Sequence, residues 1–453
     1  MINPLIFREY DIRGIAEKDL TDDVVYQIAK GFAKMCISEG IRDAIVGMDG
    51  RNSSPRIKKK VIEGLINSGI NVIDIGRVPT PVFYFATHHL KIKSGIQVTG
   101  SHNPPEYNGL KMSLNFSTIF GEKIKRIYEI VLKKDFVDGK GELKNYNIVP
   151  DYQNFLKKDI KIQKNNLKIV LDAGNGVGGE VFLPVLKDWG FEVYPLYIEV
   201  DGNFPNHFPD PTVPDNLKDL IEKVKETNAD IGIAFDGDAD RIGIIDEKGN
   251  IIWGDRLLIF LSKFMLKRNP KGKVVFEVKC SKSLPEMVEK YGGVPIMWRT
   301  GHSPIEDKIK IEKAILGGEM SGHIYFYDRY FGYDDAIYTA ARVIEILSNL
   351  DSKISDVLKE APIYPVTPEI RIECKDEVKF KIVEELTEHF KRKTEVIDID
   401  GARIIYPDGW GLVRASNTQP VLVLRFEANT EKRLEEIKKE IEGVLEEIMK
   451  KYK

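Results

Sequence analysis

The sequence predicts an α/β protein with three similar α/β domains that contain mixed sheets, followed by a C-terminal α+β domain, all grouped around a central cleft. Three observations lead to this prediction. Strand-like and helix-like segments alternate through most of the 453 residues, which is typical of α/β domains. A unit of three apolar strands recurs three times. From Val366 the pattern changes to short strands between two charged helices, expected at 376–392 and 430–451.

The recurring unit has the same order each time. The first strands are expected at 44–48, 168–172 and 273–277, the second at 71–75, 192–196 and 294–298, and the third at 95–98, 230–235 and 313–316. The densest polar clusters follow the third strands. Because open α/β sheets bind ligands at the carboxyl ends of their strands, we expect these clusters to face one cleft. The predicted domains are 1–150, 151–253, 254–365 and 366–453.

The bulk composition argues against several classes of partner. Lysine and arginine number 67 against 70 acidic residues, so neither nucleic acid nor a membrane surface is an expected partner. No segment approaches the ~20 apolar residues of a membrane span, and we expect a cytoplasmic protein. The three cysteines are far apart and odd in number, which excludes a disulfide framework or a cysteine-rich metal site.

The first polar cluster begins where the apolar strand ends at Val98. It reads Thr-Gly-Ser-His-Asn-Pro-Pro-Glu-Tyr-Asn-Gly-Leu-Lys over 99–111. Proline and Asn-Gly turns fix the shape of such a loop, and we expect an exposed loop that presents Ser101. Ser101, His102 and Lys111 are the candidates for chemistry here. An ordinary polar turn is the alternative.

The second cluster, Asp-Gly-Asp-Ala-Asp-Arg, places carboxylates at Asp236, Asp238 and Asp240. Three carboxylates on one tight loop can converge on a divalent cation that prefers oxygen ligands, such as Mg²⁺. An EF-hand would require glycine where Arg241 stands, together with flanking helices. An aspartyl-phosphate phosphatase with Asp236 as the nucleophile remains an alternative.

The third cluster, over 318–323, carries Glu319 and Ser321 two residues apart between glycines. Such a pair can hold neighbouring hydroxyl groups of a sugar, and His323 could transfer a proton because its reference pKa is ~6.5. The alternative is a glycine-rich turn with a structural histidine.

The tail contributes the segment 414–420, between two expected strands. Arg414 can fork onto an oxyanion while the polar groups of 416–418 enclose it, so the composition is that of a phosphate pocket. A hairpin with a surface arginine is the alternative.

Five segments, at 7–14, 99–111, 236–241, 318–323 and 414–420, together resemble the phosphomannomutase/phosphoglucomutase family of α-D-phosphohexomutases. The resemblance runs from residue 7 to about 427 and keeps the family's motif order. It implies that Ser101 is the serine that carries a phosphoryl group and completes a Mg²⁺ site with Asp236, Asp238 and Asp240.

The resemblance also assigns the other site residues. Lys111, Arg13 and His323 join Ser101 as catalytic candidates, with Arg241 as a further active-site group, while His102 remains a catalytic candidate from its place beside Ser101. The substrate-binding candidates are Tyr10, Lys279, His302, Glu319, Ser321, Arg414, Ser416, Asn417 and Thr418.

At some positions the residue differs from the one that is commoner in the family. Glycine replaces the usual alanine at 100, alanine replaces glycine at 239, and glutamine replaces glutamate at 419. The first two changes are between small residues, whereas the loss of the acid at 419 bears on how the phosphate loop is braced. Met320 resembles the branch that uses glucose and mannose.

The function implied is the interconversion of hexose 1-phosphates and hexose 6-phosphates of mannose, glucose or both. The implied intermediate and activator is a hexose 1,6-bisphosphate. The alternatives are a phosphoglucosamine mutase, a sugar phosphatase, and a sugar-phosphate-binding protein that has lost its chemistry. The sequence leaves open the preference between sugars, the group that carries the proton, the oligomeric state and the pathway.

Overall fold

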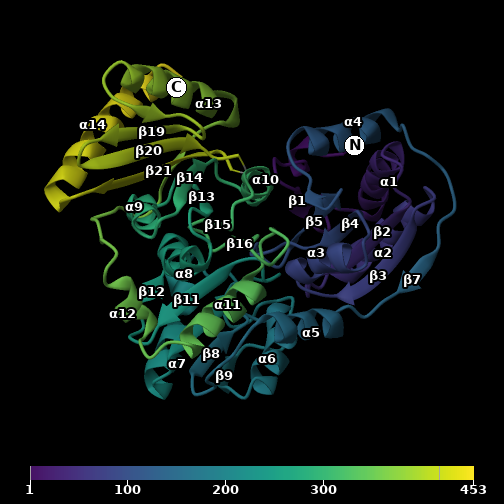
Figure 1. Cartoon of the computed structure of the whole chain (residues 1–453). Helices are drawn as coiled ribbons and strands as arrows, with labels where there is room; N and C mark the ends of the chain where they lie inside the picture. Colours follow the sequence, from purple (N-terminus) through teal and green to yellow (C-terminus); the bar gives the residue numbers. More distant parts are fainter. Residues whose placement is uncertain (1, 418, 453) are drawn as a thin grey trace.

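The computed structural model describes residues 2–417 and 419–452, and within them the chain forms four successive sheets with helices packed against them (Figure 1). The first sheet is mixed, because β4, β2, β3 and β7 are parallel while β1 and β5 are antiparallel to their neighbours. Its strands in spatial order are β1 (Ile12–Ile15), β5 (Tyr107–Leu114), β4 (Ser94–Val98), β2 (Asp43–Met48), β3 (Asn71–Arg77) and β7 (Leu143–Asn145), with β6 (Ser117–Thr118) on β5. Its helices are η1 (Pro4–Ile6), α1 (Asp22–Ser38), α2 (Ser54–Ile66), α3 (Thr80–His89) and α4 (Glu122–Lys133).

The second sheet repeats this plan after helix α5 (Val149–Asp159). Its strands in spatial order are β12 (Ile251–Ile252), β11 (Ile242–Asp246), β10 (Ile231–Phe235), β8 (Lys168–Asp172) and β9 (Glu192–Leu196). The associated helices are α6 (Gly178–Asp188), η2 (Pro214–Leu217) and α7 (Lys218–Thr227).

The third sheet has the order β14 (Val294–Trp298), β13 (Lys273–Glu277), β15 (Leu316–Gly318) and β16 (Ile324–Phe326). Its helices are α8 (Gly254–Arg268), α9 (Ser283–Lys290), α10 (His302–Glu312), α11 (Ala336–Ser348) and α12 (Ile354–Leu358). In all three sheets the second strand of the unit pairs with the first, the first with the third, and the third with an antiparallel strand. The predicted threefold recurrence is therefore confirmed.

One strand boundary was predicted wrongly. The third strand of the third unit was expected at 313–316 but is β15 (Leu316–Gly318). Lys313 instead caps α10 in the left-handed conformation, with φ of 51°. The chain needs this residue to leave the helix before it can enter the sheet, so the strand begins later.

The tail is an antiparallel sheet with two helices on one face, as expected for an α+β domain (Figure 1). Its strands in spatial order are β17 (Ile370–Glu373), β21 (Val421–Ala428), β20 (Gly409–Ala415), β19 (Ala402–Tyr406) and β18 (Val396–Ile397). The helices are α13 (Asp376–Lys391) and α14 (Glu431–Lys450). The tail contacts the third unit where Trp410 and Leu412 pack on Val278.

The core is divided in the same way as the sheets. The first unit and the tail each bury a separate hydrophobic cluster, whereas one large cluster joins the second and third units to the α3 side of the first. Helix α11 is buried along most of its length in this shared cluster. Burial of apolar surface is the main favourable contribution to folding, so it holds these three units together.

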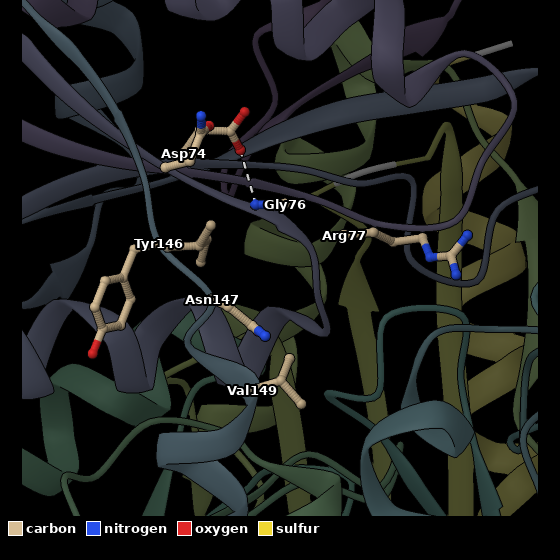
Figure 2. Close-up of a pocket in the computed structure, with 8 residues that line it drawn as sticks. Asp74, Gly76, Arg77, Tyr146, Asn147 and Val149 are labelled. Carbon is tan, nitrogen blue, oxygen red and sulfur yellow. Dashed lines mark hydrogen bonds between the residues drawn. The ribbon is translucent and has the colours of Figure 1, made fainter.

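Two further observations concern membrane-spanning helices and a surface pocket. Within the described residues no helix is both long and apolar enough for a bilayer crossing. A shallow pocket of about 400 Å³ lies between β3 and the segment before α5 (Figure 2). Its charged lining side chains are already paired, Asp74 with Lys58 and Arg77 with Glu180.

Candidate active site

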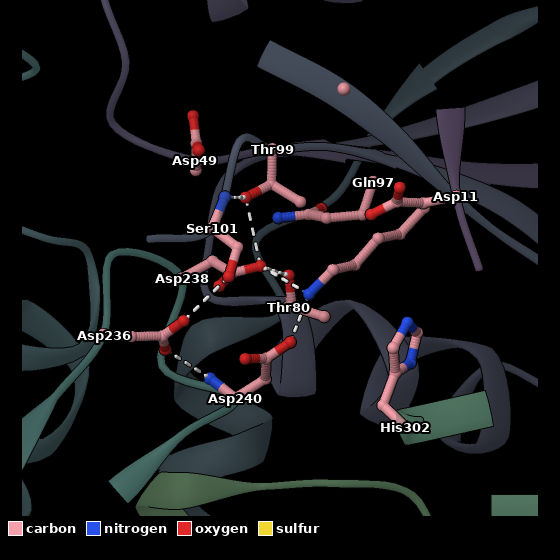
Figure 3. Close-up of polar contacts among 12 residues, drawn as sticks. Asp11, Asp49, Thr80, Gln97, Thr99, Ser101, Asp236, Asp238, Asp240 and His302 are labelled. Carbon is pink, nitrogen blue, oxygen red and sulfur yellow. Dashed lines mark hydrogen bonds and ion pairs between the residues drawn. The ribbon is translucent and has the colours of Figure 1, made fainter. Parts of the chain in front are cut away.

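Ser101 follows the fully buried strand β4. Its φ is 50°, a left-handed conformation that residues with a Cβ rarely adopt. Its Oγ donates a hydrogen bond to Asp236 Oδ2 at 2.8 Å (Figure 3). The same Oγ lies 3.1 Å from His102 Nδ1. Ser101 itself is not exposed as expected, because it is only 2% exposed, although Pro104 and Glu106 of the same loop are exposed. The Asp236 loop of the second unit covers Ser101. The sequence pattern within one unit cannot predict contacts made by another unit.

The Asp236 loop connects β10 to β11, and its three carboxylates are fully buried. One oxygen from each of Asp236, Asp238 and Asp240 lies within 4.8 Å of the others. Asp236 Oδ1 accepts hydrogen bonds from the N–H groups of Asp240 and Arg241, at 3.0 and 3.1 Å, which turns the loop tightly. Ala239 has φ of 58° in this turn.

Asp238 is held by residues of the first unit (Figure 3). Its Oδ2 accepts hydrogen bonds from Thr80 Oγ1 at 2.5 Å, Thr99 Oγ1 at 3.0 Å and Lys111 Nζ at 2.9 Å. Lys111 also pairs with Asp240. In contrast, Oδ1 of Asp238 and Oδ1 of Asp240 are buried without a hydrogen-bond partner. Buried, unpartnered carboxylate oxygens fit a divalent cation with oxygen preference.

The carboxylates and Lys111 in this cluster shift one another's pKa values in opposite directions. Burial and the charges of Asp240 and Asp238 raise the pKa of Asp236 well above its usual value. Burial and Asp240 also oppose ionisation of Asp238, but the charge of Lys111 and the hydrogen bonds from Thr80 and Lys111 together outweigh them, so the pKa of Asp238 is lowered. Burial lowers the pKa of Lys111, yet Asp238 and Asp240 reverse this effect and raise it well above 10.5. Lys111 is therefore a cation in this arrangement.

Three histidines surround the cluster. Burial is the largest cause that lowers the pKa of His102, His302 and His323, so all three are neutral at neutral pH. His323 Nε2 accepts a hydrogen bond from Arg241 Nε at 2.9 Å, and its Nδ1 lies 2.7 Å from Asp334 Oδ2. The rings of His302 and His323 have centroids 5.8 Å apart.

The sugar-binding candidates of the third unit lie on two loops, and the carboxylates of Glu319 and Glu277 accept hydrogen bonds from both loops. Glu319 Oε1 accepts a hydrogen bond from Gly301 N–H at 2.8 Å, and Ser321 Oγ donates to Glu319 Oε2 at 3.2 Å. Glu277, at the end of β13, accepts from Thr300 Oγ1 and from the N–H of Met320. Burial, followed by the charge of Glu277, raises the pKa of Glu319.

In the tail, Arg414 is only 6% exposed, which excludes the surface hairpin alternative. Its Nε lies 3.1 Å from Asp400 Oδ2. Lys379 donates hydrogen bonds to the carbonyl oxygens of Ser416 and Gln419 and so braces the loop from below. Thr418 lies outside the described residues.

The remaining candidates connect these groups. Arg13 donates to Asn103 Oδ1 at 2.7 Å and pairs with Asp11, which ties it to the Ser101 loop. The Nζ atom of Lys279 lies 3.6 Å from Oε2 of Glu277 and 3.4 Å from Oε2 of Glu369. The tail reaches the other loops through Tyr10, because Asn417 Nδ2 donates to Tyr10 Oη at 2.9 Å.

Several residues that complete the site were missed from the sequence. They are Asp49, Arg51, Thr80, Glu277, Asp334 and Asp400. Asp49 and Glu277 could have been found, because each lies at the carboxyl end of a first strand, where the unit pattern already places ligands. Thr80 begins helix α3 and carries no comparable signal.

Comparison with known proteins tests the resemblance. The phosphoglucomutase/phosphomannomutase models match in sequence order, as alpha/beta/alpha domain I at 4–138, domain II at 150–249, domain III at 253–364 and the C-terminal domain at 369–444. The phosphomannomutase/phosphoglucomutase of Pseudomonas aeruginosa is 47% identical over 434 residues, which cover 96% of this chain and 94% of the relative. The phosphoglucomutase of Neisseria gonorrhoeae is 45% identical over 97% of this chain and 96% of its own length.

A solved structure agrees with these matches. The crystal structure of a phosphoglucomutase/phosphomannomutase family protein from Burkholderia thailandensis superimposes with a TM-score of 0.94 at 41% identity. The superposition covers 99% of this chain and 98% of that structure. The family models, the full-length relatives and the shared fold agree, and the chain therefore belongs to the phosphoglucomutase/phosphomannomutase family.

Proposed function

We propose that this hexose phosphate mutase interconverts the 1-phosphates and 6-phosphates of mannose, glucose or both, through a phosphoserine at Ser101 and a hexose 1,6-bisphosphate. The observation that carries the proposal is the 2.8 Å hydrogen bond from Ser101 Oγ to Asp236. This bond supports the proposal, because the proposed phosphoryl carrier Ser101 lies against the carboxylate cluster. The names of the relatives in Pseudomonas and Neisseria support the choice of sugars.

Each predicted domain supplies one loop in this proposal. The domain 1–150 supplies Ser101, and 151–253 supplies the carboxylates. The domain 254–365 supplies Glu319 and Ser321 for the sugar hydroxyls, with Lys279 and His302 beside them. The domain 366–453 supplies the loop for the phosphate that does not react, with Arg414, Ser416, Asn417 and Thr418.

The carboxylate cluster would hold Mg²⁺ through Asp236, Asp238 and Asp240. The buried, unpartnered Oδ1 atoms of Asp238 and Asp240 are the observation that fits this ion. When bound, Mg²⁺ supplies positive charge that stabilises the negative charge on a phosphoryl group being transferred.

The chain's own residues then have distinct tasks. The bond from phosphorus to Ser101 Oγ breaks as a new bond forms to the sugar hydroxyl oxygen, and the hydroxyl proton must pass to a group that has a free lone pair. His302 is neutral and can accept it, and His323 can do so once its Nε2 is released from the Nε–H of Arg241. Lys111 is held charged by its carboxylates and, with Arg13 and Arg241, stabilises the transferred group electrostatically.

One site serves both half-reactions. The first transfer leaves a hexose 1,6-bisphosphate and an unmodified Ser101. If the bisphosphate turns around within the site, its other phosphate faces Ser101, and return of that group restores the phosphoserine. The tail loop then holds the phosphate that has just been placed. This requirement explains why the loop of Arg414 must grip either end of the sugar.

The experiment is a coupled assay with glucose 1-phosphate, mannose 1-phosphate and glucosamine 1-phosphate, in the presence of Mg²⁺ and a trace of hexose 1,6-bisphosphate. We expect turnover of the first two sugars. Ser101→Ala should lower turnover by at least ~10³-fold, as loss of a nucleophile does in other enzymes. Ser113→Ala, a buried serine of β5, is the matched control and should keep activity.

The alternatives give different results. If Ser101→Ala keeps most of the turnover and releases phosphate, Asp236 is the nucleophile of a phosphatase. Preference for glucosamine 1-phosphate would overturn the choice of sugars. Binding of hexose phosphates without interconversion, and without phosphate on Ser101, would identify a protein that only binds them.

A further inference from the structure

Arg51 lies behind the Ser101 loop and is 2% exposed. Its guanidinium group donates to four carbonyl oxygens of that loop. Nη1 donates to Pro104 O at 2.6 Å and to Tyr107 O at 2.9 Å. Nη2 donates to Ser101 O at 2.8 Å and to Asn103 O at 2.5 Å. The planar fork of an arginine carries five N–H donors on three nitrogen atoms, so it can serve four carbonyl oxygens, whereas a lysine has three donors on a single atom.

Asp49 fixes the guanidinium group in this place. Its Oδ2 lies 3.2 Å from Arg51 Nε and also accepts a hydrogen bond from the N–H of Gly100 at 3.1 Å. Its Oδ1 accepts from the N–H of Arg51 at 3.0 Å and from Ser54 Oγ at 2.5 Å. Asp49 and Arg51 thus hold the Ser101 loop from both its N–H and its carbonyl side.

The second unit closes the outer side of Arg51. The ring centroid of Phe204 lies 5.2 Å from the guanidinium carbon, and Asn52 Nδ2 donates to Asn203 Oδ1 at 2.9 Å. The backbones pack closely, since a Cβ on Gly50 would lie 2.2 Å from Val200 Cγ1. Arg51 is therefore enclosed between two loops and has no room to swing away.

These contacts act on Ser101, whose backbone conformation is unfavourable for a residue with a Cβ. Ser101 has φ of 50°, and the segment around it contains no regular hydrogen-bonded ladder until β5 begins at Tyr107. Such a conformation persists only where the surroundings enforce it. The hydrogen bond from Arg51 to Ser101 O acts on the same residue whose Oγ points at Asp236.

We propose that Arg51 is a positioning residue for phosphoryl transfer, which keeps Ser101 Oγ directed at the carboxylate cluster. This inference rests on the proposed function. Within the described residues Arg51 donates no hydrogen bond to the carboxylate cluster or to the tail loop, so it acts through the backbone of Ser101. A small displacement of a reacting group, of the order of 1 Å, can cost about 100-fold in rate.

The test compares Arg51→Lys with Arg342→Lys. Lysine keeps the buried charge but places all its donors on one atom, so it cannot span four carbonyls. Arg342 is the matched control, because it is 4% exposed and forks onto Asp328 at 3.0 and 2.9 Å outside the site. For each variant we would measure kcat and KM, the melting temperature, and the rate at which hexose 1,6-bisphosphate phosphorylates Ser101, followed by intact mass spectrometry.

We expect Arg51→Lys to lower kcat and the rate of Ser101 phosphorylation together, by about 100-fold, with KM changed less than about threefold. KM should hold because the phosphate that does not react is bound by the tail. Arg342→Lys should lower the melting temperature while kcat stays near the wild-type value. If Arg51→Lys keeps kcat within about threefold, or loses only thermal stability, the proposal is overturned.

Asp49→Asn decides the matter if Arg51→Lys does not fold. The amide keeps the shape of the side chain and an oxygen for the Gly100 N–H, but it loses the charge that orients Arg51. We expect kcat to fall about tenfold at unchanged KM, and an unchanged kcat would overturn the proposal. Wild-type protein that interconverts no hexose phosphate would overturn the proposed function instead, and the Ser101 phosphorylation rates would still decide the role of Arg51.

Discussion

Asn417 Nδ2 donates a hydrogen bond to Tyr10 Oη at 2.9 Å, across 407 positions of sequence. The same hydroxyl donates to the carbonyl oxygen of Thr300 at 2.9 Å. Tyr10 therefore joins the first unit to both the third unit and the tail. Burial raises the pKa of Tyr10, although Arg414 opposes the rise, so the hydroxyl keeps the proton that it donates. Tyr10 thus helps to place the tail loop over the other loops, together with the hydrogen bond from the N–H of Thr300 to Asp400.

Tyr10→Phe should weaken sugar-phosphate binding more than chemistry. The variant loses both hydrogen bonds of the hydroxyl but keeps the ring, which lies 5.9 Å from the ring of His302. Loss of two hydrogen bonds, at about 0.5–1.5 kcal/mol each, is worth about 1–3 kcal/mol, so we expect KM to rise about five- to 150-fold with little change in kcat. Tyr406→Phe, which loses a bond to Glu440 outside the site, is the control. A fall in kcat at constant KM would contradict this role.

Removal of divalent cations should abolish turnover reversibly. Asp238 and Asp240 each leave a buried oxygen without a hydrogen-bond partner, and without a cation these atoms remain uncompensated. After treatment with a chelator we expect activity to fall at least ~100-fold and to return on addition of Mg²⁺. Titration calorimetry should show weaker Mg²⁺ binding for Asp240→Asn. Asp246→Asn, at the far end of β11, should bind as the wild type does.

Thr80→Val should loosen the same site from the first unit. Thr80 Oγ1 donates to Asp238 Oδ2 at 2.5 Å, and its N–H donates to the carbonyl of the same residue at 2.9 Å. The variant keeps the shape of the side chain but removes a bond to a buried carboxylate. We expect Mg²⁺ affinity to fall about 10- to 100-fold, as it does when a residue that orients a metal ligand is lost.

Thr87→Val provides the control on the same helix. Thr87 is 1% exposed, but its Oγ1 donates to the carbonyl of Tyr84 within α3. Its loss should lower the melting temperature without a change in the Mg²⁺ titration. Equal Mg²⁺ affinities for Thr80→Val and the wild type would show that Thr99 and Lys111 suffice to hold Asp238.

The sequence could predict the residues whose functional side chains lie close together along the chain. Asp236, Asp238 and Asp240 stand two positions apart, and both they and Ser101 follow a third strand of the repeated unit. A local motif and the rule on strand ends therefore suffice to place them at one site. The structure adds the orientation of the carboxylates, which a sequence motif does not contain. It shows that the Oδ1 atoms of Asp238 and Asp240 are buried without a hydrogen-bond partner.

The residues that were missed meet only through tertiary packing. Thr80 and Asp238 are 158 positions apart, and Arg51 reaches four carbonyls more than 49 positions away. No periodicity or spacing encodes such pairs, because two different segments must fold before the contact exists. The mistaken exposure of Ser101 has the same cause, since its cover comes from the second unit.

His207 provides a test that depends on pH. Its Nε2 lies 3.1 and 3.3 Å from the carboxylate oxygens of Asp172, which is fully buried. Burial lowers the pKa of His207, but the hydrogen bond and charge of Asp172 outweigh it, and the pKa is raised above 6.5. A raised pKa in the folded state stabilises the protein below the unfolded value of ~6.5, and this stability is lost as the pH rises through the folded value.

The difference in melting temperature between wild type and His207→Gln should therefore be largest below pH ~6.5 and should shrink towards alkaline pH. His88→Gln is the control with the opposite sign. Burial, and then Lys310, lower the pKa of His88 to about 4, so the folded protein prefers it neutral. The wild type should lose stability relative to His88→Gln as the pH falls below ~6.5. If the two differences change in the same direction with pH, the His207–Asp172 ion pair does not stabilise the fold, because only opposite pKa shifts produce opposite slopes.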